Sequence, residues 1–400
     1  MIGLHVPQLL HKVMHPHFHY TEMREMYISI AMRSFAGSLV GVFIPIYLYV
    51  EGFGLTFITV YYLLMHLVRL VSHVLTDSLI RRFGAKHIMA ASGVLDVINM
   101  IALVMVPFWP WTVWVAMAAF GLGMGQWWSA RHLQVAIASE GKNGSSDVGR
   151  VQSIAIVATV LAPAIGGVIA TQFGIIYSLL LALVVIVLSL YPLFRTEEVM
   201  RFMPRRSIES LQFSFRNSVQ RSMFMRGVQE NVSIFVWPIF IYIALTSYQV
   251  IGGVFSFSML IGAAIAYIAG KYGDMGKNPF ILRLGSYAYM LVHLARMLGR
   301  NFASILSIDI AGTIASVLVT GPYFAEYYKR AGKSRDIIGY ITNIEVAACL
   351  GALLVWSIVM SLSLFFTDVN TLIISFFIAA GASIFIKDVA TKNRYSSSKL

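Results

Sequence analysis

Long apolar segments follow one another along almost the whole of this 400-residue chain, and no other feature restricts its fold as strongly. A helix needs about 20 apolar residues to cross the hydrocarbon core of a membrane. Hydrophobic residues make up 58% of the chain and charged residues 12%, whereas a soluble domain is about one quarter charged. The sequence therefore predicts an all-α integral membrane protein with twelve transmembrane helices. They are expected near residues 26–50, 55–80, 86–107, 110–136, 148–172, 174–194, 222–246, 248–270, 278–298, 302–328, 335–362 and 368–387.

Lys and Arg residues gather in every second loop between these segments. Most of the 30 basic residues fall on one side of the membrane if the N-terminus lies on that side. Because basic residues are retained in the cytoplasm during insertion, the N- and C-termini are both predicted to be cytoplasmic, in a multi-pass protein of the plasma membrane. The net charge of +12 then needs no nucleic acid partner, since topology and attraction to anionic membrane lipids account for it.

A charged segment at residues 195–221 divides the chain into two parts with six predicted helices each. It is expected to be a cytoplasmic linker. The N-terminal half is then 1–194, with a cytoplasmic segment at 1–25, and the C-terminal half is 222–400, with a cytoplasmic tail. The halves share a loop pattern, because Asp77–Lys86 follows the second predicted helix and Gly270–Lys277 follows the eighth. A parallel repeat of six helices is typical of one large group of secondary transporters.

The loop after the second predicted helix carries a motif similar to the signature G-x-L-A-D-R-x-G-R-K. Four of its residues match: Leu79, Arg82, Gly84 and Lys86. Asp77 stands in place of the first Gly and Arg81 in place of the Asp, so the acidic residue comes one helical turn early. The second-half copy keeps Gly270 and Asp274.

These motifs resemble the major facilitator superfamily. Pro163–Gly167 in the fifth predicted helix is similar to the end of a further family pattern, G-P-x-x-G-G, which is associated with exporters, although a packing site of small residues has the same composition. The resemblance implies two pseudo-symmetric six-helix halves and a secondary transporter that moves a small molecule by alternating access. We expect a monomer, coupled to protons or another ion, and export of amphiphilic compounds is an open possibility.

Ionisable residues inside the predicted helices are candidates for function, because a charge at membrane depth costs at least about 2.5–3.5 kcal/mol. Substrate or coupling roles are expected for four charges and three aromatic residues: Arg33, Arg69, Asp309, Glu345, Trp127, Trp128 and Trp237. Gating roles are expected for the loop motifs and for charges near cytoplasmic helix ends: Asp77, Arg82, Gly84, Lys86, Asp274, Arg131, Glu230 and Glu326. The repeat spacing would pair Arg33 with Glu230, and Arg131 with Glu326, across the pseudo-twofold axis.

One face of the second predicted helix is polar. His66, Arg69, His73 and Asp77 follow one another at spacings of three or four residues, which places them on one side of a helix. A polar stripe on a membrane-spanning helix faces protein or water rather than lipid. The stripe is therefore the best indication of a hydrated pathway.

Few features favour another class of function. The chain lacks the G-x-x-x-x-G-K-[ST] motif of ATP-driven pumps, and no nucleophile–base pair indicates an enzyme, so no cofactor is expected. The histidines near the N-terminus have no Cys or carboxylate companion except Glu22, which argues against a metal site. Two alternatives stay open: a non-transporting membrane receptor or scaffold on a transporter fold, and a membrane-embedded lipid-processing enzyme.

Overall fold

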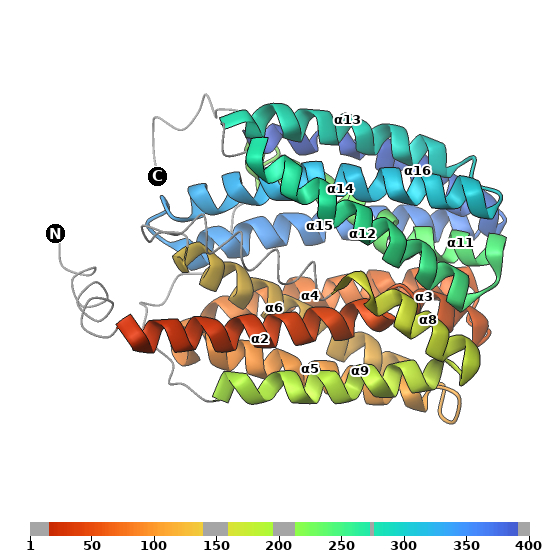
Figure 1. The fold of residues 1–400 in the computed structure, drawn as a ribbon, viewed down its shortest axis with the longest axis horizontal. Helices are drawn as coiled ribbons and strands as arrows, with labels where there is room; N and C mark the ends of the chain where they lie inside the picture. The colour runs from red at the N-terminus through yellow and green to blue at the C-terminus, as the bar shows by residue number, and fades with distance from the viewer. Residues whose placement is uncertain (1–15, 139–158, 195–212, 273–275, 391–400) are drawn as a thin grey trace.

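The computed structural model describes residues 16–138, 159–194, 213–272 and 276–390, and these residues form helices without any strand. Most helices run side by side along the long axis of the molecule, as Figure 1 shows. The first helix begins and the last one finishes at the same end of the bundle, which we call the terminal end. Elements up to residue 194 gather on one side of the bundle and those after residue 213 on the other (Figure 1). We call them the N-terminal and the C-terminal half.

The helix bounds follow the apolar segments of the sequence. The N-terminal half contains α2 (Pro16–Val40), α3 (Ile44–Val50), α4 (Leu55–Phe83), α5 (Ala85–Met105), α6 (Thr112–Ala138), α8 (Ala162–Gln172), α9 (Ile175–Leu190) and η1 (Tyr191–Phe194). The C-terminal half contains α10 (Ser218–Asn231), η3 (Val232–Val236), α11 (Trp237–Leu245), α12 (Tyr248–Tyr272), α13 (Asn278–Arg296), α14 (Phe302–Ala331), α15 (Ile337–Ser363), α16 (Asp368–Ser383) and η5 (Ile386–Ala390). Most of the predicted linker, and Asp274, lie outside the described residues.

Two predicted helices are interrupted next to prolines. The segment expected as 26–50 consists of α2 and α3 with a turn at residues 41–43, and Pro45 stands in the first turn of α3. Proline has no N–H to donate to the carbonyl four residues earlier, and its ring clashes with that carbonyl. The segment expected as 222–246 begins earlier, at Ser218, and passes through the π-helical segment η3 directly before Pro238. Such wide turns are common sites of helix kinks.

Nine helices in the described part of the chain are long and apolar enough to cross a membrane. Large apolar side chains such as Leu75, Leu284 and Phe377 are more than half exposed on the bundle, as suits a surface solvated by lipid. Trp109 and Trp111, between α5 and α6, are also more than half exposed and fit an interfacial aromatic belt. The chain is thus a multi-pass membrane protein, while the twelve spans and the cytoplasmic termini stay predictions.

The most extensive contacts between the halves are made by two helix pairs: α4 with α15, and α8 with α12. The second pair is in backbone contact at two glycines. A Cβ added at Gly167 would clash with the Tyr248 carbonyl oxygen, and one at Gly252 would clash with the Pro163 carbonyl oxygen, because each would lie closer than 3.0 Å. Small residues allow membrane helices to approach this closely. In this fold the Pro163–Gly167 pattern therefore serves helix packing between the halves.

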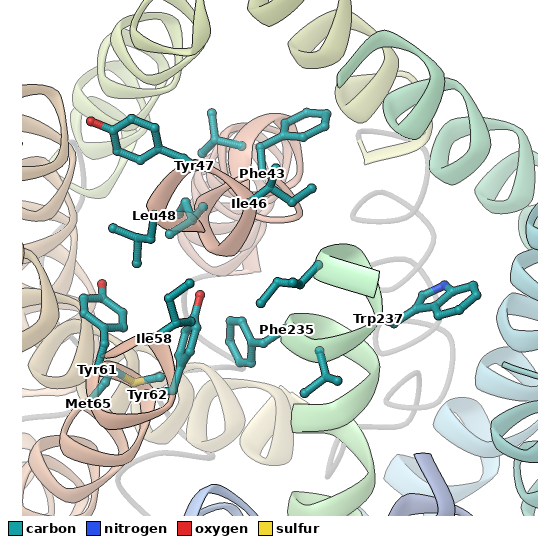
Figure 2. Close-up of a cluster of buried hydrophobic side chains, with 14 of the residues drawn as sticks. Phe43, Ile46, Tyr47, Leu48, Ile58, Tyr61, Tyr62, Met65, Phe235 and Trp237 are labelled. Atoms are coloured by element: carbon teal, nitrogen blue, oxygen red, sulfur yellow. The ribbon is translucent and has the colours of Figure 1, made fainter. Parts of the chain in front are cut away.

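An aromatic cluster fills the interface between the halves toward the end opposite the termini. Tyr62 of α4 lies with its ring centre 4.2 Å from that of Phe235 in η3 and 4.9 Å from that of Trp356 in α15. Figure 2 shows Tyr62 and Phe235 facing each other from different helices. Tyr61, Tyr62 and Trp356 are fully buried. Along α4, the polar stripe begins after this cluster and continues toward the terminal end.

Candidate functional site

Glu345, on α15 of the C-terminal half, is a carboxylate buried between the halves, with 1% of its surface exposed. Arg69 of α4 donates from Nη2 to Oε2 of Glu345 at 3.3 Å. Nε2 of His132, on α6, lies 3.4 Å from Oε1, and Nε2 of His73, on α4, lies 3.8 Å from Oε2. These three side chains all belong to the N-terminal half. We call the four residues the Glu345 cluster.

Hydrogen bonds fix the orientation of the histidines in the Glu345 cluster. Arg69 Nε donates to Nε2 of His73 at 3.2 Å, so Nδ1 of His73 carries the hydrogen and donates to Ser129 Oγ at 2.8 Å. Nδ1 of His132 lies 2.8 Å from the hydroxyl oxygen of Tyr328 on α14. Oε1 of Glu345 has no hydrogen bond of good geometry within the described residues. One oxygen of the carboxylate is therefore held by Arg69, and the other faces the imidazole of His132.

The polar stripe of α4 faces the C-terminal half. Nε2 of His66 lies 2.6 Å from Oδ1 of Asn231 on α10, and Trp356 Nε1 donates to the same oxygen at 2.9 Å. His66, His73 and Asp77 are all buried. The expectation that the stripe faces protein or water rather than lipid is confirmed, and its role as a hydrated pathway stays a prediction.

A second ionic cluster joins the halves at the terminal end. Arg81 donates to Asp77 of the same helix at 3.0 Å and to Asp336, just before α15, at 2.7 Å. Asp336 also caps α15, because its side chain accepts from the N–H of Gly339 at 3.0 Å. Thr342 of α15 donates to Asp77 at 3.4 Å. Any opening of the interface at this end must break the contact between Arg81 and Asp336.

Within the loop motif, Arg81 rather than Arg82 makes the contact between the halves. Arg82 is exposed, and its guanidinium carbon lies 5.1 Å from the centre of the Phe83 ring. Gly84 has a φ of 86°, which a residue with a Cβ rarely adopts, so it allows the turn from α4 into α5. Lys86 is buried at the start of α5.

Arg33 of α2 pairs within its own half. It forms an ion pair with Asp96 of α5 and donates from Nη1 to Ser92 Oγ at 2.7 Å. Its guanidinium carbon also lies 4.0 Å from the centre of the Trp127 ring. The expected pairing of Arg33 with Glu230 is therefore wrong for this structure.

Glu230 and Glu326 pair with arginines of their own helices. Arg226 Nε donates to Glu230 at 2.7 Å, and Arg330 Nε donates to Glu326 at 2.7 Å. Both are i,i+4 pairs, whose members are neighbours on a helix surface. The expected pairing of Arg131 with Glu326 is not made either. Arg131 is 9% exposed and makes no ion pair or hydrogen bond within the described residues, and its guanidinium carbon lies 5.1 Å from the Trp128 ring centre.

Asp309 of α14 lies inside the C-terminal half. Trp237 Nε1 donates to Oδ1 of Asp309 at 2.9 Å. The guanidinium of Arg296, on α13, lies 4.9 Å from the Trp237 ring centre and donates to Ser233 Oγ at 2.9 Å. Arg296 is the last residue of α13, yet it is only 4% exposed. Two predicted site residues, Asp309 and Trp237, thus meet, but their hydrogen bond stays within one half.

Among the predicted coupling residues, only Arg69 and Glu345 meet across the interface. His132 and Tyr328, which complete their surroundings, were not among the predicted site residues. His132 could have been noticed as an ionisable residue next to Arg131 in an apolar helix. Tyr328 gave no signal, because tyrosines are common near the ends of membrane helices.

Comparisons with known proteins agree with this architecture. No family model and no curated protein sequence matches the chain. Among solved structures, a D-xylose-proton symporter matches with a TM-score of 0.69 and 13% identity, over 92% of this chain and 96% of that one. A mutant of the nucleoside transporter NupG matches with a TM-score of 0.68 and 11% identity, over 92% of this chain and 98% of that one. The human organic anion transporter MFSD10 matches with a TM-score of 0.63 and 10% identity, over 92% of this chain and 99% of that one.

These matches show that the chain has the fold of the major facilitator superfamily transporters. The transporter fold expected from the loop motifs is thereby confirmed, while the count of twelve spans and the orientation of the termini stay predictions. The three proteins named above are all transporters. These proteins are named as transporters of a sugar, a nucleoside and organic anions, so the shared fold does not select a substrate.

Proposed function

We propose that this protein is a secondary active transporter of a small molecule in the plasma membrane, which works by alternating access and couples transport to protons through Glu345. The observation that carries the proposal is the placement of Glu345. This carboxylate belongs to the C-terminal half, while the guanidinium and the imidazoles around it belong to the N-terminal half.

Alternating access requires the halves to move relative to each other, so contacts between halves must break and form again. When the Glu345 cluster opens, the carboxylate loses the cation that neutralises it. A carboxylate in a membrane protein then needs a proton or water, because an unpaired charge is costly there. Relative motion of the halves and proton uptake at Glu345 are linked in this way.

The direction of transport is not part of the proposal. Export of amphiphilic compounds was suggested by the Pro163–Gly167 pattern, and packing between α8 and α12 is a sufficient reason for that pattern. A receptor or scaffold would not require Glu345 to exchange its partners. A lipid-processing enzyme would require reactive groups at one membrane interface, and the described contacts suggest none.

Reconstitution into liposomes tests the proposal. Purified protein would be given a panel of labelled sugars, nucleosides and organic anions, with and without an imposed proton gradient. We expect at least one compound to accumulate with the gradient and to be released by a protonophore, unlike in protein-free liposomes. If the protein binds a compound of the panel but neither accumulates nor exchanges it, the protein is a receptor and the proposal fails.

A further inference from the structure

Cations exceed anions next to the Glu345 cluster. Arg69 pairs with Glu345 and Arg226 pairs with Glu230, which leaves the charge of Arg131 without a partner within the described residues. Nη1 of Arg226 likewise has no hydrogen-bond partner there. Arg131 is largely buried, with 9% of the residue exposed. An uncompensated buried charge costs several kcal/mol, so it calls for a compensating anion.

The two arginines lie at the two ends of one aromatic wall. Its rings come from α6 and α14, that is, from both halves. Ring centres are 5.3 Å apart between Trp128 and His132, and 5.2 Å apart between His132 and Phe324. The guanidinium of Arg131 lies over Trp128, and that of Arg226 lies 4.8 Å from the centre of Phe324.

One tyrosine connects the aromatic wall with the Glu345 cluster. Tyr328 of α14 is stacked on Phe324 with ring centres 5.8 Å apart, and its hydroxyl oxygen lies 2.8 Å from Nδ1 of His132. The unpaired donors, the aromatic wall and the Glu345 cluster are therefore parts of one region between the halves.

We propose that Arg131 binds the oxyanion of the transported molecule, so that the substrate is a small organic anion, such as a carboxylate, with an apolar body. The inference rests on the proposed transport function and specifies its substrate class. A guanidinium fork matches the two oxygens of a carboxylate or a phosphate and forms strong charge-assisted hydrogen bonds with them. The aromatic wall suits the apolar body, and one bound negative charge balances the cation that Arg131 contributes.

Ligand-dependent thermal unfolding of the purified protein tests this site without requiring transport. The probes are benzoate and phenyl phosphate, each compared with a neutral counterpart: benzamide and phenol. We expect at least one anion to raise the unfolding temperature in a saturable way while its neutral counterpart does not. Arg131→Gln should weaken the binding of that anion by about 10- to 100-fold, as expected for the loss of a charge-assisted hydrogen bond. Arg131→Lys, which keeps the charge, should weaken the binding less.

Two further arms separate the possible explanations. Without ligand, Arg131→Gln should unfold at a temperature equal to or above the wild type, because it removes an unpaired charge; a clear decrease would mean that Arg131 has a structural role and would overturn the inference. The same assay is repeated with phosphatidylglycerol. If this lipid stabilises the protein while no probe anion does, and if Arg131→Gln removes the effect, Arg131 binds a lipid headgroup. This result would also overturn the inference.

The outcome is independent of the test of transport itself. If no probe anion gives an Arg131-dependent shift, the substrate class is wrong. Accumulation of a neutral sugar or nucleoside in the liposome assay would then still support the transport function. If an anion binds at Arg131 but no compound is transported, the site is confirmed and the transport function fails.

Discussion

Glu345 and Asp96 are carboxylates that each face an arginine, Glu345 fully and Asp96 largely enclosed, but they occupy different places in the molecule. Asp96 and its partner Arg33 lie on α5 and α2 of the same half. Glu345 lies in one half, and Arg69 lies in the other. The chemistry of the two pairs is similar, so the position of the interface decides what each can do. A pair within one half can persist throughout a transport cycle, whereas a pair between halves must break whenever the halves separate.

The Asp309 region supports the same distinction. Asp309 accepts a hydrogen bond from Trp237, on α11 of the same half. Within the described residues, it makes no hydrogen bond or ion pair with the N-terminal half. We therefore expect Asp96 and Asp309 to stabilise their own halves. Glu345 and Arg81 are expected to control the relative position of the halves.

The largest effect is expected at Glu345. Glu345→Gln keeps the size of the side chain but cannot take up or release a proton, so gradient-driven accumulation should be lost completely. Exchange of substrate at equal concentrations on both sides should continue, because it requires movement of the halves without net proton flow. Asp309→Asn is the matched control and should retain both activities. Equal loss of accumulation and exchange in Glu345→Gln would assign the residue a structural role.

Asp96 should instead affect stability. Asp96→Asn leaves the guanidinium of Arg33 buried without its counter-charge, and breaking such a pair costs about 3–5 kcal/mol. A lower unfolding temperature in detergent should reveal this loss. Accumulation per folded molecule should remain close to that of the wild type. If coupling is lost while the unfolding temperature is unchanged, the distinction between pairs within and between halves is wrong.

A smaller effect is expected at the terminal end. Asp336 is more than one third exposed in its side chain, so its contact with Arg81 is partly screened by solvent. Arg81→Gln should shift the balance between conformations by about 1 kcal/mol, or roughly fivefold in transport rate. The neighbouring Arg82→Gln is the control and should have little effect, since Arg82 is exposed. An equal effect of both variants would return the gating role to Arg82.

The helices were predictable from the sequence because lipid imposes a minimum apolar length on each span. The polar face of α4 was predictable as well, because the spacing of His66, Arg69 and His73 is determined within one helix. Interruptions of the helices were harder to predict. A proline lies next to each of them, Pro45 and Pro238, but the missing N–H of proline does not decide between a turn and a π-helical segment.

The partners of the charged residues could not be predicted in the same way. They depend on how each helix is rotated about its axis, and this is decided by packing between distant segments. Arg33 meets Asp96 rather than Glu230 for this reason, and Glu230 finds Arg226 one turn away on its own helix. The motif comparison also favoured Arg82 because it matched the signature. The substituted position, Arg81, carries the contact between the halves.

Distances between spin labels test the central claim, which is that the halves move relative to each other and that Glu345 controls the movement. In a Cys349→Ser background, one label pair at Phe83 and Lys333 would report on the terminal end. A second pair at Glu51 and Phe365 would report on the opposite end, and all four positions are exposed. We predict that Glu345→Gln shifts the two distance distributions in opposite directions, while Asp309→Asn leaves both unchanged. Two distributions that stay fixed, or that shift in the same direction, would contradict the account.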